Sequence, residues 1–188
     1  MEIEKEVRYN ITDEQLEKIK NITTIFSERT EMLDITCGYE GFESYSKYGF
    51  ICRIRQKGNK KTLEVKNYSN DNECLEQAIK LDKVVDGVNY LKLIGMEPYL
   101  YLKRFREIRT FKNLKIFIDE FDILGNFVEV EYQDSNNEEL NEFIELINIT
   151  AEPQDMYGAI VKKRLETELD FKKIFKENLE KILDSEQK

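Results

Sequence analysis

The sequence predicts an α+β protein built on a closed antiparallel eight-stranded β-barrel, with a charged lumen and helices packed outside it. Three observations lead to this prediction. Extended segments dominate residues 1–133, and mainly helical segments follow over 135–184. Most predicted strands alternate ionisable and apolar side chains, which places their charges on one face. The acidic pairs and the basic pairs lie on different strands. We expect one domain over 1–188.

The first predicted strand is MEIEKEVRY, at the start of the chain. Read as a strand, it places Glu4, Glu6 and Arg8 on one face and Ile3, Val7 and Tyr9 on the other. A single strand with this pattern usually turns its polar side to water. The other strands must therefore decide whether these charges face outwards or into a lumen.

A short helix is predicted directly after this strand. Thr12 can act as its N-cap, and Gln15 stands three residues later, where a capping box needs it. Period-2 runs and turn residues predict further strands at about 31–37 and 50–56, with a loop at 39–49 between them, a hairpin over 53–66, and strands at 74–81, 99–109, 114–121 and 126–133. Helical spacing predicts helices over 84–95, 135–148, 153–169 and 171–183, the third of them starting at Pro153.

The alternation of charged and apolar residues runs through nearly all of these strands. Ionisable residues that share a face within one strand are Arg53 with Arg55, Glu64 with Lys66, Arg104 with Arg106, and Glu129 with Glu131. An open sheet with a solvated face and a closed barrel with a polar interior both produce this pattern. The separation of signs favours the barrel, because a solvated face would mix signs within strands to gain weak cross-strand pairs.

The segregated charges also indicate a chemistry. Paired carboxylates can hold a divalent cation through oxygen, and paired guanidinium groups match phosphate oxygens. The chain has no histidine, which excludes Ser-His-Asp and Cys-His nucleophiles and His-ligated metals. Its cysteines, Cys37, Cys52 and Cys74, have no CxxC spacing and predict neither a zinc site nor a disulfide framework. A hard cation with several arginines is the equipment for phosphoryl transfer.

The totals limit the partners that we expect. A formal net charge of -9 over 188 residues disfavours nucleic acid as a partner, because binding phosphates along a strand needs a positive surface. No apolar run approaches the roughly 20 residues of a membrane span, and the acidic N-terminal segment is unlike a secretory signal. We therefore predict a cytoplasmic protein with no membrane partner. The oligomeric state stays open, with a homodimer as one option.

The N-terminal stretch Glu4-Lys-Glu6-Val-Arg8-Tyr9 resembles the Glu-x-Glu-x-Lys signature of the CYTH family, also called triphosphate tunnel metalloenzymes. Here Arg8 replaces the lysine, which keeps the charge and adds bidentate reach. The stretch IDEFDILGNFVEVE is similar to the family's Asp followed by Leu-Gly-x-Phe-hydrophobic-Glu-x-Glu, and is the most specific match. Other matching segments are Arg53-Ile-Arg55, the Lys66 ending in which Glu64 departs from the usual threonine, and Arg104-Phe-Arg106, with arginine in place of lysine.

The resemblance implies a tunnel whose polar lumen holds a triphosphate together with Mg²⁺ or Mn²⁺. Its metal-side carboxylates would be Glu4, Glu6, Glu129 and Glu131, with Asp119 as an additional candidate. Its phosphate-binding groups would be Arg8, Arg53, Arg55, Lys66, Arg104 and Arg106. Either Glu129 or Glu131 would orient the attacking water.

We therefore expect metal-dependent hydrolysis of a small triphosphate: inorganic tripolyphosphate, thiamine triphosphate or a nucleoside triphosphate. The first alternative is a class IV-type adenylyl cyclase that converts ATP to cyclic AMP and pyrophosphate. The second is a non-catalytic polyphosphate-binding module. No adenine-reading motif and no code for the organic group is visible in the sequence.

Overall fold

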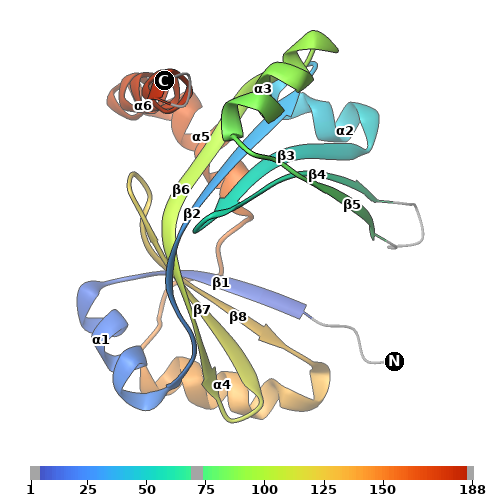
Figure 1. The fold of residues 1–188 in the computed structure, drawn as a ribbon. Helices are drawn as coiled ribbons and strands as arrows, with labels where there is room; N and C mark the ends of the chain where they lie inside the picture. The colour runs from blue at the N-terminus through green and yellow to red at the C-terminus, as the bar shows by residue number, and fades with distance from the viewer. Residues whose placement is uncertain (1–4, 69–73, 186–188) are drawn as a thin grey trace. The chain divides into compact units, whose positions relative to one another are not determined.

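The computed structural model describes residues 5–68 and 74–185 (Figure 1). These residues form eight strands of an antiparallel sheet, paired in the order β1-β8-β7-β6-β2-β3-β4-β5, and six α-helices. The strands are β1 (Lys5–Ile11), β2 (Thr24–Gly38), β3 (Phe50–Lys57), β4 (Lys60–Tyr68), β5 (Cys74–Lys80), β6 (Glu97–Phe111), β7 (Leu114–Phe121) and β8 (Gly125–Tyr132). The helices are α1 (Asp13–Ile22), α2 (Ser44–Tyr48), α3 (Val84–Leu93), α4 (Asn137–Leu146), α5 (Tyr157–Thr167) and α6 (Leu169–Ser185). The α+β class and the antiparallel sheet are confirmed.

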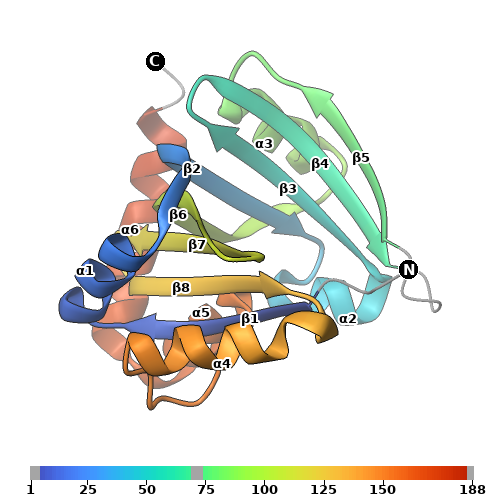
Figure 2. The same cartoon turned by 90° about the horizontal axis from the view of Figure 1, so that it is seen from below.

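The chain divides into two compact units, and the first comprises Met1–Glu31 and Arg104–Met156. Here α1 and α4 cover one face of strands β1, β8 and β7 (Figure 2). Ile19 of α1 and Phe143 of α4 are fully buried against Val128 of β8 and the apolar residues beside it. The apolar positions of each strand therefore build the core, and the alternate positions fall on the opposite face.

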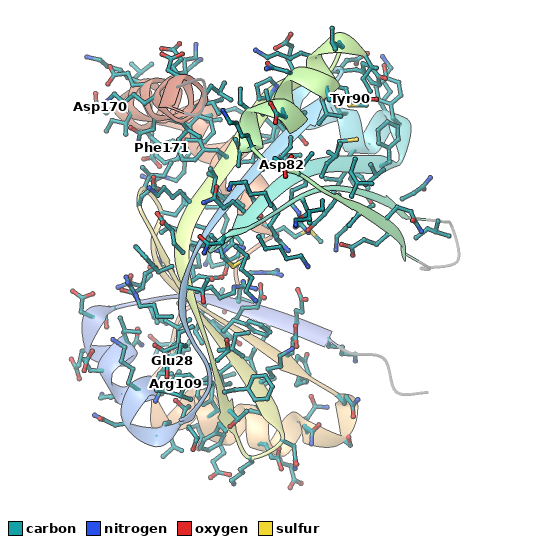
Figure 3. The ribbon with its side chains drawn as sticks, viewed as in Figure 1. Glu28, Asp82, Tyr90, Arg109, Asp170 and Phe171 are labelled. Carbon is teal, nitrogen blue, oxygen red and sulfur yellow. The ribbon has the colours of Figure 1, made fainter. Side chains whose placement is uncertain are left out.

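Polar contacts fix both ends of α1. The predicted capping box is present: Gln15 N–H donates to Thr12 Oγ1 at 3.2 Å, and Thr12 N–H donates to Gln15 Oε1 at 3.0 Å. At the other end, Arg109 of β6 donates to Thr23 Oγ1 at 2.6 Å and to the carbonyl oxygen of Lys20 at 2.8 Å. Arg109 (labelled in Figure 3) thus binds the last turn of α1, on the helix-covered side of the sheet.

The second unit comprises Met32–Lys103 and Tyr157–Lys188. Its predicted hairpin is formed by β3 and β4, and Gly58 adopts φ +54° in the turn. Helix α3 packs closely on β3, since a Cβ at Gly87 would lie only 2.9 Å from Cγ1 of Ile54. Helix α6 packs on the first part of β6, where the rings of Tyr101 and Phe175 have centroids 4.7 Å apart.

Two predictions about local structure were wrong. The predicted loop at 39–49 contains a short 3-10 turn, Gly41–Glu43, followed by α2, which ends at Gly49 with φ +74°. The helix predicted to start at Pro153 begins at Tyr157, because the preceding segment runs beside β1, where Gln154 N–H donates to the carbonyl of Arg8 at 2.8 Å. Within the described part of the chain, no helix combines the length and the apolar character that crossing a bilayer requires.

Candidate functional site

Strand pairing gathers charges on the face of the first unit that the helices leave uncovered. Glu6 lies directly opposite Glu131, and Arg8 lies opposite Glu129, in the pairing of β1 with β8. Residues separated by more than a hundred positions therefore meet on one surface. We call this surface the first charged face and define it by Glu6, Arg8, Arg104, Arg106, Lys115, Asp119, Glu129 and Glu131. The predicted ligand Glu4 lies outside the described residues.

Glu129 is the shared acceptor of this face. Arg8 Nε donates to its Oε2 at 2.5 Å, and Arg106 Nη2 lies 3.3 Å from its Oε1. Only 5% of Glu129 is exposed. Burial raises the pKa of its carboxyl, while Arg106 and Arg8 lower it, and Glu6 and Asp119 add to the rise. The two guanidinium groups therefore fix the orientation of this buried carboxylate.

Asp119 lies at the centre of an arginine cluster on β6 and β7. Its oxygens accept hydrogen bonds from Arg106 Nε at 2.7 Å and Arg106 Nη2 at 2.5 Å, and Arg104 Nε lies 3.2 Å from its Oδ1. The carboxylate is completely buried. Arg106 also stacks over the ring of Phe117, 4.7 Å from its centroid. In this arrangement Asp119 orients the two arginines.

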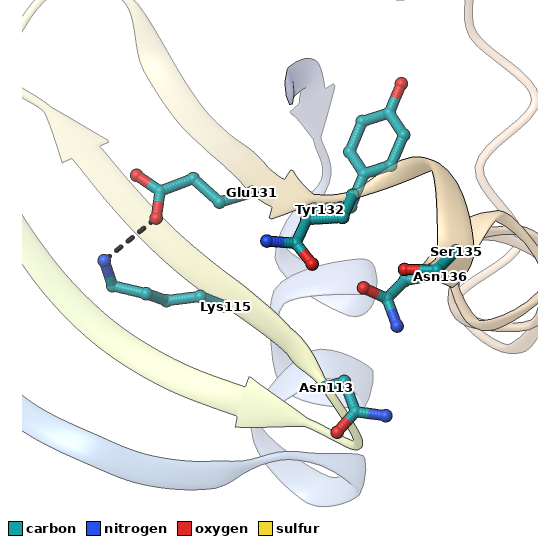
Figure 4. Close-up of a pocket in the computed structure, with 7 residues that line it drawn as sticks. Asn113, Lys115, Glu131, Tyr132, Ser135 and Asn136 are labelled. Carbon is teal, nitrogen blue, oxygen red and sulfur yellow. Dashed lines mark hydrogen bonds and ion pairs between the residues drawn. The ribbon is translucent and has the colours of Figure 1, made fainter. Parts of the chain in front are cut away.

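Two acidic residues lie side by side at the more open part of the face. Glu6 pairs with Arg8, and Glu131 accepts a hydrogen bond from Lys115 Nζ at 2.9 Å (Figure 4). Like charges directly opposite each other across two strands are unfavourable unless a cation lies near them. The nearby Arg8 and Lys115 supply positive charge here, and a bound metal ion would supply more.

A pocket of about 380 Å³ opens beside the Lys115–Glu131 ion pair (Figure 4). Both side chains line it, and the ring of Tyr132 points away from Asn113. The other lining residues are Gln133, Ser135 and Asn136. The first charged face therefore continues into a hollow with a polar lining.

The donor chemistry of the first charged face fits a hard divalent cation. Glu6, Glu129 and Glu131 offer carboxylate oxygens on two adjacent strands, which is the donor type that Mg²⁺ and Mn²⁺ prefer. Over the residues that the structure describes, no three acidic or thiol side chains converge closely enough to form a metal cage. A cation at this site would therefore share these oxygens with their present arginine and lysine partners.

The second unit carries a charged face of its own, on β2 to β5. Arg55 donates to Asp34 through Nε at 2.6 Å and through Nη2 at 3.0 Å. Arg53 donates to Glu64 Oε2 through Nε at 2.9 Å and through Nη2 at 2.5 Å. We define this second charged face by Asp34, Arg53, Arg55, Glu64, Lys66 and Glu76. Each cation here has a nearby carboxylate on a neighbouring strand.

Three residues of these faces were not predicted from the sequence: Asp34, Glu76 and Lys115. Lys66 Nζ lies 2.8 Å from Glu76 Oε2, and the pair holds the pKa of Glu76 below its usual range. Each missed residue has no charged residue two positions before or after it in the sequence, whereas the predictions relied mainly on such charged doublets. The detectable signal was its period-2 position, which matches that of a charged doublet on the adjacent strand.

Comparison with known proteins identifies the fold. Residues 2–155 match the model of the CYTH domain. Among curated proteins, no sequence matches this chain. The structure is similar to a putative adenylate cyclase from Vibrio parahaemolyticus, with 18% identity, a TM-score of 0.61, and coverage of 86% of this chain and 98% of that one.

Two further solved structures are similar at the same level. The PH1819 protein of Pyrococcus horikoshii is 25% identical, with a TM-score of 0.58 and coverage of 86% of this chain and all of that one. A putative adenylyl cyclase from Hippeastrum that shows a dominant triphosphatase activity is 14% identical, with a TM-score of 0.58 and coverage of 86% and 94%. The domain match spans most of the sequence and includes both charged faces, and the chain belongs to the CYTH family.

Proposed function

We propose that this protein is a metal-dependent triphosphatase. The observation that carries the proposal is the first charged face, where Glu6, Glu129 and Glu131 lie on paired strands beside arginines. The family includes triphosphatases and putative adenylyl cyclases, which both act on triphosphates. The proposal includes the closed eight-stranded barrel with a charged lumen that the sequence predicts. It is supported by the placement of ionisable side chains on one face of the sheet in each unit.

In this proposal Glu6, Glu129 and Glu131 hold Mg²⁺ or Mn²⁺, together with Glu4 and with Asp119 as an additional candidate. A bound divalent ion would neutralise phosphate oxygens and lower the pKa of a coordinated water. The arginines beside these carboxylates keep the acidic cluster together before the cation arrives. Asp119 contributes chiefly by orienting Arg104 and Arg106, because its oxygens face their guanidinium groups.

The basic side chains bind the triphosphate. Guanidinium groups form charge-assisted hydrogen bonds to non-bridging phosphate oxygens and stabilise the charge that the terminal phosphoryl group carries in the transition state. The groups that we assign to this role are Arg8, Arg104 and Arg106 of the first charged face and Arg53, Arg55 and Lys66 of the second.

Hydrolysis also needs an oriented water. A carboxylate of Glu129 or Glu131 accepts a hydrogen bond from this water and takes up its proton as the water oxygen attacks the terminal phosphorus. The phosphoanhydride P–O bond breaks, and the rest of the polyphosphate leaves with the bridging oxygen. Glu129 is held by Arg8 and Arg106, which fixes the direction of its oxygens. We place this activity in the cytoplasm and on a small triphosphate rather than a nucleic acid, in keeping with the net charge of -9.

A substrate panel tests the proposal. The purified protein is incubated with Mg²⁺ or Mn²⁺ and with tripolyphosphate, thiamine triphosphate or ATP, and the products are separated by chromatography. The variants Glu129→Gln and Glu131→Gln are compared with Glu145→Gln, which makes the same change at an exposed position on α4. We expect phosphate release by the wild type and by Glu145→Gln, and its loss in the other two variants.

The other outcomes select the alternatives. Cyclic AMP and pyrophosphate formed from ATP would identify an adenylyl cyclase in place of a hydrolase. Tight binding of tripolyphosphate with no turnover under any condition would identify a binding module. Phosphate release that survives in both Glu129→Gln and Glu131→Gln would refute the assignment of the catalytic carboxylates.

A further inference from the structure

We infer that Asp34 is a positioning residue that fixes the guanidinium of Arg55 for binding a phosphate group. Asp34 lies on β2, directly opposite Arg55 on β3. Its carboxylate binds Arg55 through two parallel contacts, Nε to Oδ1 at 2.6 Å and Nη2 to Oδ2 at 3.0 Å. This fork-to-fork geometry holds a guanidinium in one plane, which a single contact cannot do.

The burial of the two partners is unequal. Asp34 is 3% exposed, whereas the Arg55 side chain is 26% exposed. The carboxylate is therefore part of the sheet, and the guanidinium is the part that an incoming ligand can reach. A guanidinium carries five N–H donors in a planar fork, so a phosphate oxygen would approach Arg55 from its exposed side while Asp34 holds the other edge of the fork.

The surroundings of Arg55 show why its direction needs fixing. Arg55 Nη1 lies 3.9 Å from Glu64 Oε2, while Glu64 is bound by Arg53 at 2.5 Å and by the hydroxyl of Thr62 at 2.9 Å. A mobile Arg55 could turn towards Glu64 and compete with Arg53 for it. The contact with Asp34 holds Arg55 away from that competition, so that each arginine keeps its own carboxylate.

The alternative role for Asp34, simple neutralisation of Arg55, predicts the opposite change in tripolyphosphate affinity. If Asp34 only neutralised Arg55, its negative charge would weaken the binding of a polyanion, and removing the charge would strengthen binding. If Asp34 positions Arg55, removing or moving the carboxylate weakens binding even though the face becomes more positive. Affinity for tripolyphosphate thus separates the two roles by direction, not only by size.

The experiment compares Asp34→Asn, Asp34→Glu and the control Asp82→Asn, which changes an exposed residue of the same unit (Figure 3). Binding of tripolyphosphate is measured by calorimetry in EDTA, and KM and kcat for phosphate release are measured with Mg²⁺. We expect Kd and KM to rise about tenfold in both Asp34 variants, with kcat within about twofold of the wild type, since a positioning loss on a substrate-binding arginine acts on binding. Asp34→Glu keeps the charge, so a neutralising role predicts no change in that variant.

A double-mutant comparison covers the case in which an Asp34 variant is unstable. Lysine cannot form the fork, so in an Arg55→Lys background the change Asp34→Glu should weaken binding by less than about twofold. Thermal unfolding of every variant shows whether the fold is intact. Additive losses in the double mutant would overturn the inference, and so would Asp34→Asn binding tripolyphosphate more tightly than the wild type.

The inference rests on the proposed function only for the choice of tripolyphosphate as the probe, and the two can fail separately. Binding without phosphate release, weakened by Asp34→Glu, would support Asp34 as a positioning residue and refute the hydrolase. Phosphate release with unchanged KM in Asp34→Glu would support the hydrolase and refute the role of Asp34. A wild-type protein that binds no tripolyphosphate in EDTA or with Mg²⁺ would overturn both.

Discussion

The two charged faces use the same residue types in different ways. On the first charged face, carboxylates are shared: Glu129 contacts Arg8 and Arg106, and Asp119 contacts Arg104 and Arg106. On the second charged face, each cation is held chiefly by a separate carboxylate, as in the pairs of Arg55 with Asp34 and Lys66 with Glu76. The sharing there is weaker, since Arg55 Nη1 lies 3.9 Å from the Glu64 carboxylate that Arg53 binds. Sharing couples the groups, so that one substitution affects several partners.

Exposure differs between the Asp119 cluster of the first charged face and the Lys66–Glu76 pair of the second. Arg104 is 4% exposed and Asp119 is completely buried, whereas the Lys66 side chain is 24% exposed and that of Glu76 is 42% exposed. Buried ion pairs are costly to break, because an uncompensated charge stays in the interior, while exposed pairs contribute little. The Asp119 cluster should therefore contribute more to stability than the Lys66–Glu76 pair. The first charged face, which holds the proposed catalytic carboxylates, should act on the chemical step, and the second should act mainly on substrate binding.

The largest expected effect is that of Asp119→Asn on stability. Losing this charge leaves Arg104 and Arg106 without a shared buried anion, and breaking such a pair costs about 3–5 kcal/mol of the free energy of unfolding. Urea unfolding measures the change, with Asp82→Asn as the exposed control. A cost below about 1 kcal/mol would contradict the large contribution to stability that we expect from the Asp119 cluster.

The second effect separates kcat from KM. Arg106 binds Asp119 through two hydrogen bonds and also contacts Glu129. Arg106→Lys removes a contact that orients this proposed catalytic carboxylate, so we expect kcat to fall about a hundredfold. Arg53 binds Glu64 on the second charged face, so Arg53→Lys should raise KM about tenfold with little change in kcat. Steady-state kinetics with tripolyphosphate tests both, and the same kcat effect in both variants would erase the proposed division.

The third effect is stabilisation by metal. Mg²⁺ at about ten times its Kd should add about 1.4 kcal/mol to the free energy of unfolding, because it binds the folded carboxylates and relieves the repulsion of Glu6 and Glu131. Thermal and urea unfolding with and without Mg²⁺ measure it. Glu131→Gln should remove the gain, and Glu64→Gln on the second charged face should keep it. If only Glu64→Gln removed the gain, the metal would bind at the second charged face, against this proposal.

Much of this arrangement was predictable because strand side chains alternate with period 2. The doublets Arg53 with Arg55 and Glu129 with Glu131 do share faces, as predicted. What the sequence could not supply is register between distant strands. Arg8 and Glu129 are 121 positions apart, and their contact depends on how β1 aligns with β8.

Single charges were the other limit. Asp34 is the only acidic or basic side chain in the run Leu33–Gly38 apart from the thiol of Cys37, and a lone carboxylate gives no charged doublet to notice. Its role is visible only once β2 is paired with β3 and Arg55 lies opposite it. The prediction of a loop at 39–49 was wrong for a different reason. Its Gly and Ser residues indicate a loop, but a glycine such as Gly49 can also end a short helix with a positive φ.

The smallest effect tests how weak the second charged face is on its own. The hydrogen bond from Lys66 lowers the pKa of Glu76 from its ordinary value of 4.5, with further lowering by Arg53 and Arg55. A carboxyl with a depressed folded pKa adds stability above its unfolded pKa and loses it as the pH falls through the folded pKa. Because Glu76 is largely exposed, we expect Glu76→Gln to cost only about 0.5 kcal/mol at neutral pH.

That cost should vanish at a pH low enough to protonate Glu76 in both the folded and the unfolded protein. The wild type and Glu76→Gln should therefore have equal free energies of unfolding in acid. Urea unfolding at neutral pH and in acid, at low and at high salt, measures the difference. High salt should shrink it at neutral pH, since the pair is accessible to ions. A cost above about 2 kcal/mol that persists in high salt would mean that the second charged face is as tightly coupled as the first, and its arginines would then be held for stability rather than poised for phosphate.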